Sequence, residues 1–85
     1  MSQVLYILAK DTLPDRALFP PAPRADERTS VVLIQDAVGL RQVPGEQVYA
    51  LQDDVAQRRV TAAFPMISYR DLLRMIFQAD RVMAL

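Results

Sequence analysis

Acidic side chains follow three apolar segments of the chain, at the point where each segment ends. They are Asp11, Asp36, Asp53 and Asp54. If the segments are parallel strands, their carboxyl ends meet at one edge of a sheet, which is where such sheets bind ligands. Paired carboxylates at that edge can do acid–base chemistry or hold a hard cation. Aspartate between a strand and a helix is also an ordinary turn or cap residue, and we interpret these four first in that way, next as partner contacts, and last as catalytic groups.

Two other polar residues stand at the same predicted edge. Lys10, the single lysine of the chain, follows the first apolar segment, and Gln35 precedes Asp36. A lone lysine there is a solvated side chain in the simplest interpretation, and an anion contact or a nucleophile in the alternative. The sequence thus predicts one set of candidate pocket or partner contacts: Lys10, Asp11, Gln35, Asp36, Asp53 and Asp54.

The composition excludes much of the usual catalytic chemistry. The chain has no cysteine and no histidine, which removes disulfides, thiolate metal sites, a cysteine nucleophile and the commonest general base. No serine lies in a G-x-S-x-G turn, and the two glycines cannot form a phosphate-binding loop. We therefore expect no enzyme activity, no catalytic residue, no cofactor and no metal. The formal net charge of zero gives no reason to expect direct binding to nucleic acid.

The elements that position these residues are read from apolar patterning. Val31–Ile34 is a continuous aliphatic run, typical of a strand buried on both faces of a parallel sheet. The predicted strands are residues 4–9, 31–36, 47–51 and 81–85, with residues 65–67 short and extended. Residues 10–30 are rich in proline and predict an exposed connection with at most a turn or two of helix near 11–18. Pro44-Gly45 predicts a turn.

Two helices complete the prediction. The first is capped by Asp53 or Asp54 and runs to Arg58 or Arg59, with acidic residues at its start and arginines at its end. The second spans residues 68–79, opened by Ser68 and Asp71 as a weak capping box. Its buried face is predicted to comprise Leu72, Leu73, Ile76 and Phe77. The fold class is therefore α/β, a small, mainly parallel sheet of four to five strands with helices packed on it, and residues 1–85 form one domain.

An apolar surplus predicts self-association. The chain has 85 residues, of which 52% are hydrophobic, and a sheet this small cannot bury all of them internally. We expect a homodimer when the chain is isolated, with Val38, Leu40 and Val43 as the candidate subunit interface. No apolar run is long enough to span a bilayer and no basic segment precedes a long apolar one, so we expect a cytoplasmic protein without membrane contact.

Three segments in order resemble the DsrH/TusB family of the DsrE/DsrF-like superfamily. They are Val32-Leu33-Ile34-Gln35-Asp36-Ala37-Val38, Val48-Tyr49-Ala50-Leu51-Gln52-Asp53-Asp54-Val55-Ala56-Gln57-Arg58, and Ile67-Ser68-Tyr69-Arg70-Asp71-Leu72-Leu73. The family pattern is an apolar strand ending in Q-[DN]-[GA]-V, a V-Y-A strand leading into an acidic pair and a helix, and an S-Y-x-[DE] helix start. The resemblance covers most of residues 4–85 and is weakest across 10–30.

The resemblance implies a DsrE/F/H-like α/β domain and a role in sulfur transfer. TusB is one subunit of a TusBCD relay that carries persulfide sulfur toward 2-thiouridine, at the wobble position of tRNA, and DsrH is its counterpart in the DsrEFH complex of sulfur oxidation. A sister subunit's cysteine carries the sulfur, so the implied partners are DsrE/TusD-like and DsrF/TusC-like subunits in a hetero-oligomer.

This chain departs from the family in several ways. It has Arg58-Arg59-Val60 where the family tends to have A-R-G, Ala37 where glycine is common, and a short first crossover. Because it has no cysteine, it cannot itself carry a persulfide, and the implied role is a non-catalytic subunit. A different hypothesis is a stand-alone homo-oligomeric domain that binds a small anion or metabolite at the strand ends through Lys10, Gln35 and Asp36.

Overall fold

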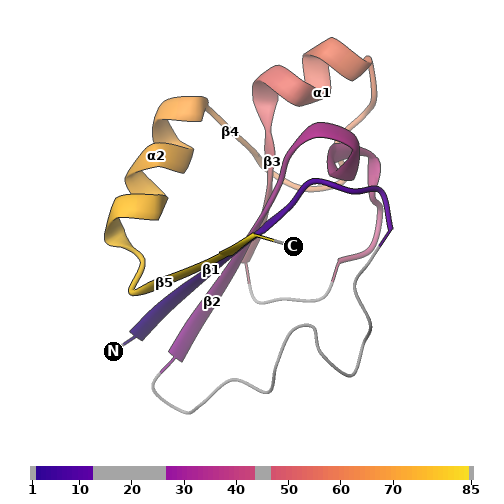
Figure 1. The fold of residues 1–85 in the computed structure, drawn as a ribbon. Helices are drawn as coiled ribbons and strands as arrows, with labels where there is room; N and C mark the ends of the chain where they lie inside the picture. The colour runs from indigo at the N-terminus through magenta and orange to yellow at the C-terminus, as the bar shows by residue number, and fades with distance from the viewer. Residues whose placement is uncertain (1, 13–26, 44–46, 85) are drawn as a thin grey trace.

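The computed structural model describes residues 2–12, 27–43 and 47–84. Figure 1 shows a parallel β-sheet with helices on both faces. The strands are β1 (Ser2–Leu8), β2 (Glu27–Leu33), β3 (Gln47–Leu51), β4 (Met66–Ile67) and β5 (Arg81–Ala84). The helices are the 3₁₀ helix η1 (Gln35–Gly39), α1 (Gln52–Arg58) and α2 (Tyr69–Gln78). The predicted α/β class is confirmed: five strands, all parallel, lie in the order β4-β3-β2-β1-β5.

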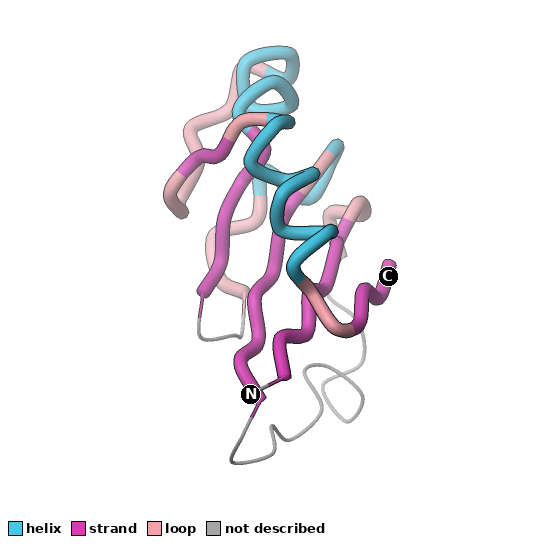
Figure 2. The backbone as a smooth tube through the Cα atoms, turned by 90° about the vertical axis from the view of Figure 1, so that its left-hand side faces the viewer, coloured by secondary structure: helices cyan, strands magenta, loops and turns pink. Residues whose placement is uncertain are grey.

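The apolar runs are strands buried on both faces, as expected of a parallel sheet covered by helices. Val31, Val32 and Leu33 of β2 are fully buried, and their side chains alternate between two cores. One core joins Val31 and Leu33 to η1 and α1, and the other joins Val32 to α2. Figure 2 shows α2 alone across the near face of the sheet, with the other helices behind it.

β2 differs from the predicted strand at both ends. It starts at Glu27 and stops at Leu33, not at residue 36. Ile34 still donates its backbone N–H to the carbonyl of Leu8 (2.8 Å), but Gln35 takes a left-handed conformation with φ of 50°. That reversal starts η1, which the apolar pattern did not predict. The predicted strand 47–51 is confirmed, and β1 and β5 lie within two residues of their predictions.

The two helices lie close to their predicted ranges. α1 starts at Gln52 and ends at Arg58. The predicted cap at Asp53 or Asp54 is wrong: the N-cap is Leu51, which makes no side-chain cap bond, and both aspartates lie inside the first turn. α2 is flanked by caps at Ser68 and Ala79, and its start is a full capping box. The Ser68 hydroxyl accepts the Asp71 N–H (3.1 Å), and the Asp71 carboxylate accepts the Ser68 N–H (3.3 Å).

The predicted buried face of α2 is wrong for two of its four residues. Leu72 is buried and Ile76 packs with it, but Leu73 is 40% exposed and Phe77 is 86% exposed. Met75 and Ala79 take their places in the core. The reason is geometric: positions 72, 75, 76 and 79 form one stripe with helical spacing, which leaves 73 and 77 on its flank.

The predicted subunit interface is wrong for one of its three residues. Val38 is buried inside the chain's own core, so its side chain is not available as a subunit contact. Leu40 and Val43 are partly buried against the same core, and their role at an interface stays a prediction. Two predictions fall on residues outside the described ranges: most of the helical turn expected near 11–18, and the turn expected at Pro44-Gly45.

Candidate functional site

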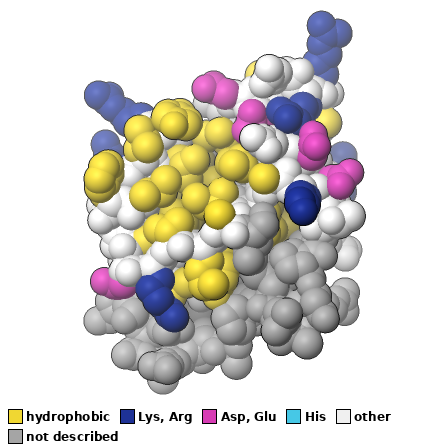
Figure 3. Space-filling view, in the orientation of Figure 1, with side chains coloured by type: hydrophobic (Ala, Val, Ile, Leu, Met, Phe, Trp, Pro, Cys, Tyr) yellow, Lys and Arg dark blue, Asp and Glu magenta, His cyan; other side chains and the backbone are white. Residues whose placement is uncertain are grey.

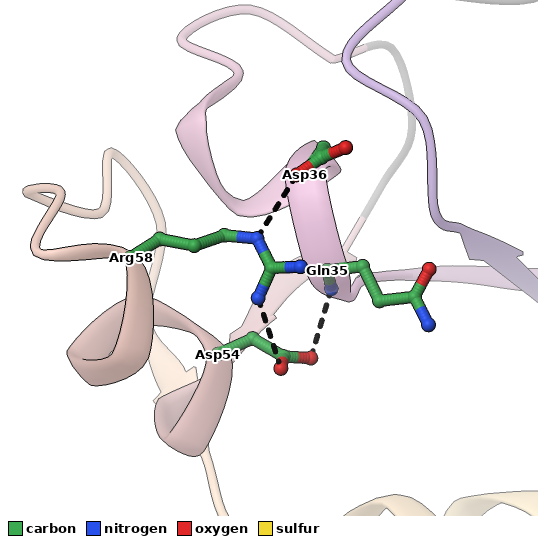
Figure 4. A network of polar contacts seen from close by, with 4 residues as sticks. All are labelled: Gln35, Asp36, Asp54 and Arg58. Atoms are coloured by element: carbon green, nitrogen blue, oxygen red, sulfur yellow. Dashed lines mark hydrogen bonds and ion pairs between the residues drawn. The ribbon is translucent and has the colours of Figure 1, made fainter.

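A cluster of polar side chains joins η1 to α1 at the carboxyl ends of β2 and β3 (Figure 4). The Arg58 guanidinium lies between two carboxylates, with Nε 3.0 Å from Oδ1 of Asp36 and Nη1 3.4 Å from Oδ1 of Asp54. The second oxygen of Asp54, Oδ2, accepts the backbone N–H of Gln35 at 2.8 Å. Three of the six predicted contact residues, Gln35, Asp36 and Asp54, therefore meet in one network.

The topology explains why these residues meet. β2 and β3 are neighbouring parallel strands, with Leu33 paired to Ala50, so the segments that follow them leave the sheet side by side. η1 and α1 begin within two residues of those strand ends. Asp54 lies in the first turn of α1 and Arg58 follows one turn later, the spacing at which side chains on a helix touch.

Burial across the cluster is uneven. The side chain of Asp54 is 17% exposed, that of Arg58 is 31% exposed, and that of Asp36 is 70% exposed. An ion pair as open as Arg58–Asp36 contributes only about 0–1 kcal/mol to stability. The more enclosed carboxylate is Asp54, which accepts from Gln35 where that residue has a positive φ. The network therefore fixes the junction between β2 and η1, and its anchor is Asp54.

The chemistry available to this cluster is limited. It holds two carboxylates, one guanidinium and a backbone amide, and none of these is an activated nucleophile. The carboxylates share an arginine, so their charge is partly offset within the protein. In the part of the chain that the structure describes, no group of three or more histidine, cysteine, aspartate or glutamate residues is placed to hold a metal ion.

The other predicted contact residues, Lys10, Asp11 and Asp53, do not join this network. Lys10 and Asp11 are exposed in the segment after β1, and Asp53 is exposed in the first turn of α1. None of the three makes a hydrogen bond or ion pair with another described residue of the cluster. Sequence reasoning assigned Arg58 to the helix end and missed its central place, although its i, i+4 spacing from Asp54 was a usable signal.

A small hollow lies near the opposite end of the sheet. Its polar lining comes from Gln3, Ser30 and Gln78, and Met75 and Ala79 of α2 also line it. Its volume of about 40 Å³ has room for a few water molecules, whereas sites for metabolites are typically about 300–1,000 Å³. The hollow is therefore not a metabolite site.

Comparison with known proteins gives no assignment. No family model matches the chain, and neither a curated protein nor a solved structure matches it. Among the described residues, no helix has the length and apolarity to cross a membrane.

Proposed function

We propose that this chain is a non-catalytic subunit of a sulfur-relay complex of the TusBCD or DsrEFH kind, with a DsrE/F/H-like domain, acting in the cytoplasm. The observation that carries the proposal is the ordered set of three family-like segments in a chain with no cysteine. A chain without a thiol cannot accept a persulfide. It can hold and orient a sister subunit whose cysteine does so.

The places of the three segments in the fold support this proposal. The first covers the end of β2 and η1, the second covers β3 and α1, and the third covers the capped start of α2. In the first two segments, four polar residues form the Arg58 network, Gln35, Asp36, Asp54 and Arg58, whereas Asp53 of the acidic pair does not join it. In the third segment, Ser68 and Asp71 form the capping box of α2. These residues build the scaffold, and none is reactive, as expected for a subunit whose work is docking.

The experiment is to express the tagged chain in its native host together with the cysteine-bearing DsrE/TusD-like and DsrF/TusC-like candidates, and to purify the complex. A cysteine desulfurase and its substrate then load the complex with persulfide, and intact mass is measured for every subunit. We expect the sulfur adduct on a sister subunit and an unchanged mass for this chain. Failure of both sisters to co-purify, or an adduct on this chain, would refute the proposal.

Deletion of the gene separates the two kinds of relay. If the complex serves tRNA, the 2-thiouridine content of bulk tRNA falls, as measured by mass spectrometry of nucleosides. If it serves sulfur oxidation, growth on reduced sulfur compounds falls and tRNA is unchanged.

The alternative, a stand-alone domain that binds a small anion at the strand ends, has less support. Arg58, the cation nearest to Gln35 and Asp36 in the network, already contacts two carboxylates. Lys10, the cation that motivated this hypothesis, does not join the network.

A further inference from the structure

The two edges of the sheet are built differently. β4 forms one edge and consists of only Met66 and Ile67, directly after Pro65. Short strands and proline are the devices by which proteins prevent an edge from pairing with another chain. β5 forms the other edge, with four exposed residues, one charge and no proline. Among the described strands, β5 pairs only with β1, so no described strand lies on the outer side of β5.

An apolar surface adjoins this open edge. Met75, Gln78 and Ala79 of α2 share the small hollow with residues 3–5 of β1 and with Ser30 of β2, so this flank of the helix lies over β1 and β2. The opposite flank, which faces β5, carries Tyr69, Leu73 and Phe77, all exposed. Val82 of β5 pairs with Leu5, whose side chain lies in the α2 core, so it belongs to the same surface. Figure 3 looks onto this edge and shows hydrophobic side chains gathered across it.

We propose that a second copy of this chain binds here, with its β5 antiparallel to β5 of the first. The result is one continuous sheet through both copies, with the two α2 helices on the same face. The surface defined by Tyr69, Leu73, Phe77 and Val82 is then buried between them. The inference does not depend on the role in sulfur relay.

The geometry suits a two-fold axis. In a two-fold contact the same patch of both copies meets itself. The midpoints of α2 and of β5 must therefore both lie level with the two-fold axis. α2 is ten residues long, about 15 Å, and it runs back along β1 from the turn at Asp80, whose backbone is bonded to Gln3. The midpoint of α2, near Leu73, therefore stands level with the midpoint of β5, near Val82 and Met83. A single axis can centre both elements.

The distribution of charge on α2 and β5 is compatible with a second copy of the chain at this edge. The residues of this seam, Tyr69, Leu73, Phe77 and Val82, carry no charge. With the two α2 helices antiparallel, Arg70 in the first turn of one lies near the last turn of the other. That last turn has no basic residue of its own, and a helix C-terminus attracts a cation. The copies thus complement each other at both ends of the seam.

The first experiment is sedimentation of the purified full chain at tens of micromolar, with the Phe77→Glu variant beside it. We expect a dimer, and we expect Phe77→Glu to weaken association by about thirtyfold or more, the loss typical of an aromatic hot spot. Val60→Glu, another exposed apolar position but outside the seam, should leave association unchanged. Far-UV circular dichroism checks that both variants fold. A monomeric wild-type chain, or equal effects of the two variants, overturns the inference.

Single cysteines test the seam directly, because the chain has none of its own. In an antiparallel pair, residues opposite each other have side chains on the same face of the sheet. Val82 and Met83 lie on opposite faces, so Val82 cannot oppose Met83 of the second copy. The two-fold axis therefore passes beside a pair of identical residues, either the two Val82 or the two Met83. Val82→Cys or Met83→Cys should form an intermolecular disulfide under mild oxidation, since paired Cα atoms are about 4.5–5.5 Å apart. Met66→Cys is the matched control, at the other edge and 53% exposed against 43% for Met83. A wild-type dimer in which neither Val82→Cys nor Met83→Cys crosslinks better than the control would place the interface elsewhere.

Discussion

Replacing Asp54 by alanine tests the role assigned to the Arg58 network. The change removes the acceptor of the Gln35 N–H, one of the two ion pairs of Arg58, and a negative charge at the start of α1. Asp53→Ala is the matched control, because Asp53 lies in the same first turn and is exposed. Both variants lose the same favourable interaction with the helix dipole, so their difference isolates the contacts of Asp54.

The size of the effect follows from these contacts. A hydrogen bond to a charged acceptor contributes about 1.5–3 kcal/mol, and we expect the low end because Gln35 is exposed and its N–H can bind water in the variant. The ion pair adds at most about 1 kcal/mol. The dipole term, about 0.3–1 kcal/mol, is largely offset by the better helix propensity of alanine. We expect Asp54→Ala to lose about 2 kcal/mol and Asp53→Ala less than about 0.5 kcal/mol.

Urea unfolding followed by far-UV circular dichroism measures both losses, at one protein concentration because association would otherwise shift the result. A loss of about 2 kcal/mol is large against the roughly 4–13 kcal/mol expected for a domain of this length. Added salt should reduce only the small part due to Arg58, since salt screens exposed ion pairs. Equal losses for the two variants would refute the view that Asp54 anchors the junction of β2 and η1.

Three more predictions concern the helices. In a Phe77→Glu background that prevents pairing, Leu72→Ala should cost about 2–5 kcal/mol, because Leu72 is buried; Leu73→Ala should cost less than about 1 kcal/mol, and similar costs would contradict the orientation of α2. Ser68→Ala should lower the free energy of unfolding by about 1 kcal/mol through loss of the N-cap, and no change in urea midpoint would count against the capping box. Arg59 ends α1 with φ of 54°, so Arg59→Gly should be neutral or stabilise by up to about 1 kcal/mol while Arg59→Val destabilises; a melt in which valine equals glycine would show that this conformation is not kept.

The sequence predicted the strands well because their cause is local. The run Val31–Ile34 makes a strand apolar on both faces, and such a strand is buried only in a sheet that has helices on both faces. The end of β2 was mispredicted because its cause is distant. Ile34 is as apolar as its neighbours, and the chain turns at Gln35, whose N–H bonds to a carboxylate 19 residues away.

The orientation of α2 shows a second limit. Leu72, Leu73, Met75, Ile76 and Phe77 spread around more than half of the helix, so several faces satisfy the pattern equally. Packing on β1 and β2 selects one of them, and no local signal ranks Leu73 below Met75.

The candidate site was predicted in part. The strand ends placed Asp36 and Asp54 at the same edge, and the structure joins them. That they meet through Arg58 depends on the angle between η1 and α1, which no local pattern fixes. Lys10 and Asp11 follow β1 at the same edge, since the Leu8 carbonyl accepts the Ile34 N–H, but neither bonds to the described residues of the network.

The bond between Asp80 and Gln3 has a consequence for how the chain folds. The Asp80 carboxylate accepts the Gln3 N–H (2.7 Å), and the Gln3 carbonyl accepts the Asp80 N–H (2.8 Å), across 77 residues. It helps to set the register of β5 on β1. Because β1 is made before the other described strands, its β5 side stays unpaired until the chain has been made as far as β5. Contacts this far apart in sequence slow folding, and a nascent strand with an open side is vulnerable to mispairing. Release of residues 80–84 from the ribosome is therefore the step that completes the described sheet, and a pause before it should favour aggregation.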